Sequence, residues 1–374
     1  MGLKRNQQQV RKKALIITYY WPPAGGPGVQ RWLKFVKYLP EYNIDPIVFI
    51  PDNPNYPMTD ESLLDEVSSE VKIVRFPISE FISTENIETI ITTGPPHSLH
   101  LIGLQLKERL GVKWLADFRD PWTSIGYHKQ LKLTKKSQLK HKFLEQQVLD
   151  HADQIIVTSF TTKKEFEGLT KQPVHVITNG YDMMSTAKSN LDKKFSISHI
   201  GSLLSKRNPD VLWRVFHDLI NENKGFSKDF QLNLIGVVSD NVMKNIQNYN
   251  ITDYVNKVGY VSHKEAITYQ KKSQVLLLIE IDSDETKGII PGKLFEYMVS
   301  NRPIIAIGPA DSDVETIIKE TNSGSYFNYN DYNSLKILIL NHYGAFKNGT
   351  LQSHPIGLQK YSRKELTKSL SNLI

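Results

Sequence analysis

Short apolar runs of strand length alternate along the chain with longer segments in which apolar residues recur at helical spacing. Between Val29 and Leu39 the apolar side chains lie three and four residues apart. Residues 98–111 repeat this spacing up to Gly111, a residue type that commonly ends helices. The runs expected to form strands in the first half are 14–20, 45–51, 71–77, 87–94, 112–118, 153–159 and 174–180. Strand and helix in strict turn predict a parallel sheet with helices on both faces, a doubly wound α/β domain.

The same alternation begins again in the second half of the chain. The strands expected there are 195–203, 230–238, 255–261, 274–281 and 302–308. Between the halves, the polar stretch from about Met183 to Lys194 is interpreted as a linker. We therefore expect two Rossmann-like domains, at residues 1–185 and 186–357. Ligands of such sheets bind outside the carboxyl ends of the strands, so two domains that face each other predict a cleft lined by strand-to-helix turns.

The last residues, 358–374, are expected to form a closing helix. Ser362, with Glu365 three residues later, fits a capping box. One face of this helix is apolar and predicts packing on the body of the protein. The side chains of that face are Leu366, Leu370 and Leu373.

Composition and charge narrow the classes of protein to which the chain can belong. Its 374 residues are 40% hydrophobic and 23% charged, as in soluble globular proteins. Lysine and arginine exceed aspartate and glutamate by 46 to 39, and the net charge of +7 suits an anionic partner: nucleic acid, a phosphorylated small molecule or an acidic membrane face. The absence of cysteine excludes disulfides, thiolate zinc sites and cysteine nucleophiles. No apolar window reaches the roughly 18 residues of a membrane span, and no signal peptide is indicated, so we expect a cytoplasmic protein.

The turn after the first expected strand contains two prolines and then the adjacent glycines Gly25 and Gly26. A strand cannot continue through Pro22-Pro23, and glycine loses the most conformational freedom on folding. Backbone amides at such a turn can approach an anion closely, aided by the positive end of the following helix. A tight turn without a ligand is the alternative. The stretch does not fit the dinucleotide fingerprint GxGxxG, because its third position would be Arg31.

The corresponding turn in the second half carries a hydroxyl and two cations. Its strand ends at Gly201, and Ser202, Lys206 and Arg207 follow before Pro209, a residue type that suits the start of a helix. Two cations and free helix amides at one strand end can hold a diphosphate through charge-assisted hydrogen bonds. A solvated basic turn is the alternative.

A third turn contains Gly292, Lys293 and, in the first turn of the expected helix, Glu296. A carboxylate near a helix start is stabilised by the helix dipole and can also accept hydrogen bonds from a ribose diol. The alternative is a helix-start glutamate without a ligand.

Strand ends of the first half supply further candidates. Asp117, Arg119 and Asp120 close one strand, and His97 follows another at an expected helix start. An arginine flanked by carboxylates is often a structural ion pair, and a histidine at this position is often a cap. These residues remain acceptor-side candidates.

A run of lysines between residues 129 and 142 contains no acidic residue. Such a run is usually a solvated helix face. Here Leu139, Phe143 and Val148 follow helical spacing, and a basic amphipathic helix can rest on anionic lipid. Aromatic residues interleaved for stacking on single-stranded bases are absent, and no nucleic-acid partner is expected.

Together these stretches resemble the GT-B glycosyltransferases of family 4, which are retaining and use nucleotide sugars. The resemblance covers nearly the whole chain. It rests on Gly25-Gly26, on "ITNGYD" at 177–182, "HIGSLLSKRNP" at 199–209, "VGYVSHKEAI" at 258–267 and "PGKLFEYMVSNRPIIAIG" at 291–308. It implies that the second domain holds the nucleotide sugar and the first domain the acceptor, a saccharide or a lipid-linked hydroxyl compound.

The resemblance also implies roles for single residues. Gly25-Gly26 would approach the donor phosphates or sugar, Arg207 and Lys206 would bind the diphosphate, and Glu296 the ribose. Lys293 occupies the place where some members carry a diphosphate-binding lysine. The donor is a substrate, so no cofactor and no metal is implied. The expected product is a precursor of a cell-surface polysaccharide or glycolipid.

The chain departs from the family pattern at two places. The family's paired glutamates are separated by seven residues, but the position eight before Glu296 is Gly288, with Asp284 and Glu285 out of register. The family's frequent active-site histidine is replaced by Arg119 followed by Asp120. We expect the catalytic group to be Asp120, Arg207 and Lys293.

The expected reaction is sugar transfer with retention of configuration. Cations and helix-start amides stabilise the leaving diphosphate, while the acceptor hydroxyl attacks from the same face and passes its proton to the departing phosphate. A nucleotide-sugar epimerase of the same fold is an alternative, although it needs acid–base carboxylates and the first glutamate is missing. A basic nucleic-acid or membrane-surface binding protein is a further alternative, which salt-dependent DNA binding would favour.

Overall fold

The computed structural model describes residues 11–75, 78–126, 128–182 and 190–374. The chain divides into two compact units, Met1–Asp182 together with Tyr361–Ile374, and Met183–Lys360. The expected linker begins at this first division, and its residues 183–189 lie outside those described. From Tyr361 onward, the expected closing segment belongs to the first unit.

The first unit is built on a seven-stranded parallel sheet with strand order β3-β2-β1-β4-β5-β6-β7. All seven strands predicted for this half are present, with ends that differ by a few residues. The strands are β1 (Lys12–Ile17), β2 (Ile44–Phe49), β3 (Lys72–Val74), β4 (Thr89–Gly94), β5 (Lys113–Phe118), β6 (Gln154–Val157) and β7 (Val174–Val176). The helices are α1 (Pro27–Tyr38), α2 (Ile78–Thr84), α3 (Leu99–Leu110), α4 (Lys135–His151), α5 (Phe160–Glu167) and α13 (Arg363–Ser371).

Two hydrophobic cores cover the two faces of this sheet. Successive side chains of a strand point to opposite faces, so in β1 Ala14 and Ile16 join one core while Leu15 and Ile17 join the other. The first core is closed by α1 and α13, and the second by side chains from α2, α3, α4 and α5. The continuous apolar runs of the sequence therefore correspond to strands that are buried on both faces of the sheet.

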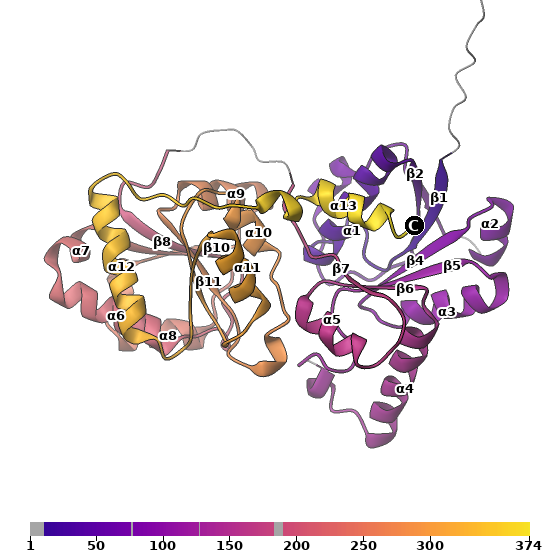
Figure 1. Cartoon of the computed structure of the whole chain (residues 1–374). Coiled ribbons are helices and arrows are strands. Elements are labelled where there is room, and N and C mark those ends of the chain that lie inside the picture. The colour runs from indigo at the N-terminus through magenta and orange to yellow at the C-terminus, as the bar shows by residue number, and fades with distance from the viewer. Residues whose placement is uncertain (1–10, 76–77, 127, 183–189) are drawn as a thin grey trace, which may run out of the picture. The chain divides into compact units, whose positions relative to one another are not determined.

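Helix α13 lies beside α1, although more than 320 residues separate them along the chain (Figure 1). Leu366 and Leu370 are buried in the core that α1 also covers, which confirms the predicted apolar face. Ser362 caps the helix by accepting a hydrogen bond from the Glu365 amide at 3.2 Å. Gly180 allows this approach, since a Cβ there would lie 2.3 Å from the Tyr361 carbonyl oxygen.

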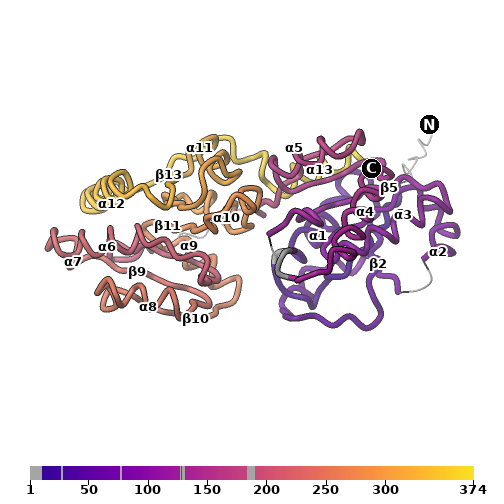
Figure 2. The backbone as a smooth tube through the Cα atoms, turned by 90° about the horizontal axis from the view of Figure 1, so that it is seen from below, coloured from indigo at the N-terminus to yellow at the C-terminus, as the bar shows by residue number. Residues whose placement is uncertain are grey.

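The second unit is built on a six-stranded parallel sheet with order β10-β9-β8-β11-β12-β13, whose two edge strands lie at opposite ends (Figure 2). Its strands are β8 (Phe195–Ile200), β9 (Phe230–Ile235), β10 (Val255–Gly259), β11 (Val275–Ile279), β12 (Ile304–Ile307) and β13 (Gly324–Phe327). Its helices are α6 (Asp210–Glu222), α7 (Lys224–Asp229), α8 (Asp240–Asn248), α9 (His263–Lys272), α10 (Lys293–Met298), α11 (Asp313–Thr321) and α12 (Tyr332–Lys347).

Five of these six strands were predicted, and β13 was missed. Its sequence, GSYF, is short and only its last residue is buried, so it carries no apolar signal. It is held as a strand by parallel pairing with β12. The prediction of two parallel-sheet α/β domains is confirmed. Within the described residues, none of the helices has both the length and the apolar character that a membrane span requires.

Candidate functional site

The strand order of the second unit changes direction between β8 and β11, which are neighbours in the sheet. Successive strands run outward from β8 to β10 on one side and from β11 to β13 on the other. In open α/β sheets the crevice at such a switch point, at the carboxyl ends of the strands, is where ligands bind. The turns that follow β8 and β11 are therefore the place to look for a site.

The turn after β8 begins at Gly201, whose φ of +113° favours glycine. Its amide donates to the Ile235 carbonyl at 2.7 Å, so this turn is tied to the end of β9. Gly236, with φ of +118°, faces it closely, because a Cβ on Gly236 would lie 2.6 Å from the Gly201 carbonyl oxygen. Two glycines thus hold the backbone of the turn in place. The sequence indicated the first of them and not the second.

Lys293 is the first residue of α10, and its amine reaches back to β8. Its Nζ lies 3.0 Å from the Ile200 carbonyl oxygen and 3.2 Å from His199 Nε2. Loss of water around the amine lowers the pKa of Lys293 to about 7, and the charge of Arg207 acts in the same direction. An amine that has lost part of its hydration but can still be reached by a ligand is suited to bind an anion.

Arg207 and Lys206 lie in the turn between β8 and α6. Pro209 directly precedes the first residue of α6, at the helix start where it was expected. The Arg207 backbone amide donates to the Leu204 carbonyl at 2.8 Å. Among the described residues, its guanidinium has no hydrogen-bond or ion-pair partner. Its charge acts on both Lys293 and Glu280, so it lies in the same electrostatic neighbourhood. Lys206 and Ser202 are exposed beside it.

Glu296 lies one turn after Lys293 on α10, and side chains of α9 hold its carboxylate. Its Oε1 is 2.9 Å from His263 Nε2, and its Oε2 accepts a hydrogen bond from Gln270 Nε2 at 2.8 Å. Gly292, just before the helix, borders open space, because a Cβ there would meet nothing within 4 Å.

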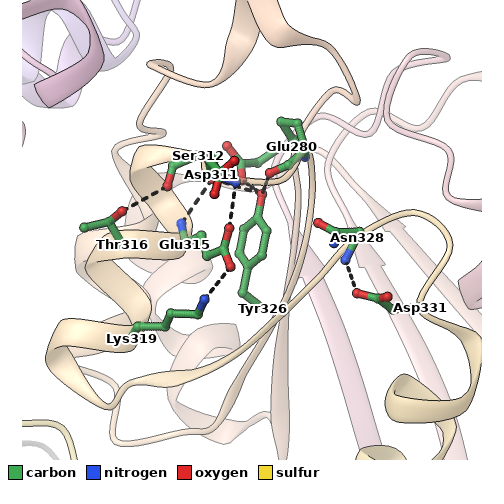
Figure 3. Close-up of polar contacts among 10 residues, drawn as sticks. Glu280, Asp311, Ser312, Glu315, Thr316, Lys319, Tyr326, Asn328 and Asp331 are labelled. Carbon is green, nitrogen blue, oxygen red and sulfur yellow. Dashed lines mark hydrogen bonds and ion pairs between the residues drawn. The ribbon is translucent and has the colours of Figure 1, made fainter. Parts of the chain in front are cut away.

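Glu280 follows β11 directly and is a buried carboxyl group that the sequence reading did not single out. Its Oε2 accepts hydrogen bonds from Tyr326 Oη at 2.7 Å and Ser312 Oγ at 3.1 Å (Figure 3). Its Oε1 is buried and has no hydrogen-bond partner among the described residues. Burial raises the pKa of Glu280 to about 7. The cluster needs a glycine at position 308, since a Cβ there would lie 2.6 Å from Glu280 Oε2.

In the first unit the strand order changes direction between β1 and β4, and Arg119 connects the turns at this point. Its Nε donates to the Gly94 carbonyl at 2.9 Å, and its Nη2 donates to the Pro95 carbonyl. Gly28 gives it room, because a Cβ there would lie 1.8 Å from Arg119 Nη1. Asp120 lies next to Arg119, and burial raises the pKa of its carboxyl.

His97 lies in the turn after β4 with neither ring nitrogen hydrogen-bonded within the described part of the chain. It is 9% exposed and stacks on Trp122 and Phe118 at centroid distances of 5.5 and 5.9 Å. Burial lowers the pKa of His97 to about 3, so the ring is neutral at physiological pH. It does not cap α3, because no side-chain bond is made to the start of that helix.

Asp117 is completely buried in the first unit and its carboxylate is used within the core. It pairs with Arg31 at 2.8 Å and accepts hydrogen bonds from Trp32 Nε1 at 2.8 Å and Thr93 Oγ1 at 2.9 Å. The ion pair considered for this strand end was that of Arg119 with its flanking carboxylates, but the cation that pairs with Asp117 is Arg31. We assign Asp117 a structural role and keep His97 and Arg119 as candidates that border the turns.

The glycine pair after β1 packs on a neighbouring loop of the same unit. The Gly25 amide donates to the Met58 carbonyl at 2.9 Å, and a Cβ on Gly25 would lie 3.2 Å from Met58 Cε. Gly26 has φ of +98° and precedes α1. Backbone conformation and this packing account for both glycines, and access of a ligand to them stays a prediction.

Among the residues of these sites that were missed in the sequence, three polar ones had a signal. His199 interrupts the apolar strand "FSISHI" one residue before its end, and Glu280 ends the apolar run "QVLLLIE". Arg31 is a charged residue directly before the apolar pair Trp32-Leu33 on α1. A polar side chain inside or at the end of a buried strand needs a partner, which sequence alone does not identify.

Solved structures with the same architecture were found, each at low sequence identity. HepE of Anabaena in complex with UDP and glucose matches with a TM-score of 0.66 and 11% identity over 97% of this chain and 99% of that chain. The lipopolysaccharide outer core galactosyltransferase WaaB matches with a TM-score of 0.64 and 16% identity over 97% and 98%. A putative UDP-N-acetylglucosamine 2-epimerase of Listeria monocytogenes matches with a TM-score of 0.56 and 11% identity over 96% and 95%.

These similarities extend over both units and establish the GT-B fold for the chain. No protein-family model and no curated protein sequence matches it.

Proposed function

We propose that the chain is a glycosyltransferase that moves a sugar from a nucleotide-sugar donor to a hydroxyl group of an acceptor. The observation that supports this most is the cation pair at the switch point of the second unit. Lys293 Nζ lies at the end of β8, and the Arg207 guanidinium lacks a partner among the described residues. A diphosphate would supply the negative charge for both.

In this proposal the second unit holds the donor. Arg207, Lys206 and Lys293 bind the diphosphate, the Ser202 hydroxyl and Gly292 border it, and Glu296 accepts hydrogen bonds from the ribose hydroxyls. Asp120 is kept as a proposed catalytic residue, and His97 and Arg119 are kept as acceptor-side candidates.

The bond between the anomeric carbon and the diphosphate breaks in the reaction, and negative charge grows on the leaving oxygen. Lys293 and Arg207 stabilise that charge electrostatically, which lowers the barrier more than it strengthens ground-state binding. The acceptor hydroxyl attacks from the face that the diphosphate leaves, and its proton passes to the departing phosphate oxygen. Configuration at the sugar is retained, and no protein base and no metal takes part.

The proposed acceptor is a saccharide or a lipid-linked hydroxyl compound of polysaccharide or glycolipid synthesis. We further propose that the chain works in the cytoplasm, at the inner face of a membrane. Leu139 and Phe143 on α4 are 69% and 61% exposed among lysines, as expected of a surface that rests on anionic lipid.

A thermal-shift panel of UDP-, GDP-, ADP- and dTDP-sugars tests the proposal. A ligand that binds the folded state alone raises the melting temperature, by about 2.7 kcal/mol of stability at a hundred times its Kd. The best donor is then incubated with candidate acceptors, and the anomeric configuration of the product is read by NMR. No shift with any sugar nucleotide would contradict the donor site, and an inverted product would contradict retention.

A nucleotide-sugar epimerase is the second candidate. Glu280 favours it, because a buried carboxyl with a pKa of about 7 at a strand end is suited to general acid–base chemistry. Incubation of UDP-N-acetylglucosamine without acceptor separates the two reactions. An epimerase converts the sugar while it stays on the nucleotide, whereas a transferase releases UDP only when an acceptor is present.

A further inference from the structure

The amine of Lys293 is held by two acceptors that both belong to β8. Its Nζ lies 3.2 Å from His199 Nε2 and 3.0 Å from the Ile200 carbonyl oxygen. A Cβ on Gly201 would lie 3.4 Å from the same Nζ, so the amine sits against the glycine turn. His199 is completely buried beneath this contact. The position of the amine is therefore set by the strand and not by solvent.

The tautomer of His199 is the one in which Nδ1 donates to its second partner. Its Nδ1 lies 3.1 Å from the Leu277 carbonyl oxygen on β11. The Ser202 backbone also bonds to the ring. A carbonyl only accepts and the Lys293 amine has hydrogens to donate, so we assign the hydrogen to Nδ1 and the lone pair to Nε2 of the neutral ring. Burial first, and then the charge of Lys293, holds the pKa of His199 well below 6.5. The ring stays neutral, and Nε2 accepts a hydrogen bond from Lys293.

Counting hydrogens on the amine shows what a bound anion would require. A neutral lysine amine has two hydrogens and an ammonium has three. His199 Nε2 and the Ile200 carbonyl already accept two. The third hydrogen, which a phosphate oxygen would accept, exists only on the ammonium. Because the pKa of Lys293 is about 7, the empty site carries that third hydrogen in only part of the molecules at neutral pH.

We propose that His199 is a positioning residue of the diphosphate site, and that a bound diphosphate draws one proton from solvent onto the amine that His199 holds. The inference rests on the proposed nucleotide-sugar site. Donor binding then consumes a proton above neutral pH, and the lysine returns it to solvent when the diphosphate leaves. His199 keeps the amine beside Gly201 in both protonation states.

Other charged groups face Lys293 and have to be separated from it. Arg207, in the turn after β8, lowers the pKa of Lys293, and Glu296, on α10, raises it. Tyr297 of α10 bonds to the Ile200 backbone, and burial holds the pKa of its hydroxyl far above neutrality. His263 of α9 bonds to Glu296, so a change of charge on His263 would also act on the field around Lys293. A His263→Gln variant is therefore a necessary control.

The first measurement uses the full chain without ligand. Long-range nitrogen NMR of His199 is expected to show a hydrogen on Nδ1 and a bare Nε2 from pH 6 to 9. The Nε2 signal should move with an apparent pKa near 7 as Lys293 titrates, and this movement should vanish in Lys293→Met and persist in His263→Gln. A hydrogen on Nε2, or a signal that does not move, overturns the proposal.

The second measurement is UDP-glucose binding by calorimetry between pH 6.5 and 8.5, in buffers of different ionisation enthalpy. The diphosphate diester of this probe does not titrate in that range, so proton uptake reports the protein. If UDP-glucose binds only the protonated form of an amine with a pKa of about 7, its affinity should fall roughly 20-fold from pH 6.5 to 8.5. Lys293→Met should flatten the profile. Binding by the wild type without proton uptake overturns the proposal.

Variants of His199 separate positioning from stability. His199→Leu removes the acceptor and should weaken UDP-glucose binding on the order of tenfold, whereas His199→Gln, which keeps an acceptor, should recover most of it. His217→Leu is the matched control, because its Nδ1 bonds to the Tyr249 carbonyl at 2.6 Å as His199 bonds to Leu277, without a lysine. Equal affinity and proton uptake in folded His199→Leu would overturn the role of His199.

The two measurements also distinguish this inference from the proposed function. Coupled titration of His199 and Lys293 in a protein that binds no sugar nucleotide would support the pair and contradict the glycosyltransferase. UDP-glucose binding without the coupled titration would support the proposed donor site and contradict the His199–Lys293 pair.

Discussion

Arg207 is a partly buried cation whose guanidinium has no partner among the described residues. A donor that arrives with two charges on its diphosphate is also bound by Lys293, so loss of Arg207 should weaken binding only moderately. Negative charge on the leaving group increases as the sugar departs, so removal of Arg207 should destabilise the transition state strongly. Arg207→Ala is expected to lower kcat about 100-fold, or about 2.7 kcal/mol, with a smaller rise in KM.

Steady-state kinetics with varied donor concentration check this prediction. Arg207→Lys should recover only part of kcat, because lysine keeps the positive charge but lacks the planar two-donor geometry of arginine. Arg214→Ala is the control, since Arg214 lies on α6 with its guanidinium over the Tyr332 ring. A rise in KM with unchanged kcat would mean that Arg207 binds ground state and transition state equally.

The buried carboxyl of Glu280 should make stability depend on pH. Its pKa is about 7 in the folded chain against an ordinary 4.5, so the folded state keeps a proton that the unfolded state has lost. The contribution of this proton to the free energy of unfolding is therefore fully present below pH 4.5 and is lost as the pH rises through 7. Between pH 5 and 8 the decline is about 2.5 kcal/mol, and Glu280→Gln should remove it.

Denaturant unfolding of both proteins at pH 5, 6, 7 and 8 measures this difference. Glu285→Gln, which changes an exposed carboxylate eleven residues before Glu296, should leave the pH profile of the wild type unchanged. Parallel profiles for wild type and Glu280→Gln would show that Glu280 ionises normally.

At the scale of elements, α4 combines an exposed amphipathic end with a buried one. Its last turns bury Val148 and Leu149, while Leu139 and Phe143 remain largely exposed among lysines. The helix extends away from the sheet of the first unit (Figure 1). Glu145 marks the change, because its carboxylate accepts hydrogen bonds from the Trp122 and Thr123 amides at 2.9 and 3.1 Å. The sequence predicted a basic amphipathic helix with Leu139, Phe143 and Val148 at helical spacing, and the structure buries Val148 while it leaves the other two exposed.

Liposome sedimentation tests α4 as a membrane contact. Each lysine near an anionic surface contributes about 1 kcal/mol, so glutamine at five positions should abolish sedimentation that is strong at low salt. The five are Lys132, Lys135, Lys136, Lys140 and Lys142; the side chain of Lys129 lies outside those described. The double variant Leu139→Ser with Phe143→Ser should bind more weakly at every salt concentration.

A charge-matched control distinguishes this face from net charge alone. Five exposed lysines of the second unit are changed to glutamine, namely Lys224, Lys228, Lys244, Lys257 and Lys264. The control should sediment like the wild type. Equal loss in both variants would assign binding to the +7 charge of the whole chain, and no loss in the α4 variant would remove the contact.

At the scale of the whole molecule, the two units differ in how they use the chain. The second unit is continuous and has its own core, whereas the first needs α13 from the C-terminus to fill the core beside α1. A fragment of residues 190–360 should therefore fold alone and bind the same sugar nucleotide as the full chain. A fragment of residues 1–182 should lose cooperative unfolding, because the pocket for Leu366 and Leu370 is exposed.

Circular dichroism melts of both fragments, with and without the ligand found by thermal shift, check these outcomes. Residues 1–182 supplied with a peptide of residues 358–374 form the control that restores α13. A folded 190–360 fragment that binds no sugar nucleotide would place essential donor contacts in the first unit.

The sequence by itself determined the class of fold and supplied the candidate site residues. Most buried parallel strands are continuous apolar runs, so twelve of the thirteen strands of the described residues could be located along the chain without any tertiary information. In open α/β sheets ligands bind at the turns that follow such strands, which is why spacing and chemistry made Arg207, Lys293 and Glu296 candidates. β13 was lost because its four residues have little apolar character, and pairing with β12 makes them a strand.

Only the tertiary structure decided which polar groups are partners. Asp117 was a candidate beside Arg119 in sequence, but its cation is Arg31, 86 residues away. His199 meets Lys293 at a separation of 94 residues, and Glu280 meets Tyr326 at 46. Local propensity and periodicity report the burial of a residue, whereas a hydrogen bond between distant strands depends on sheet order and register, which are set by packing of the whole unit.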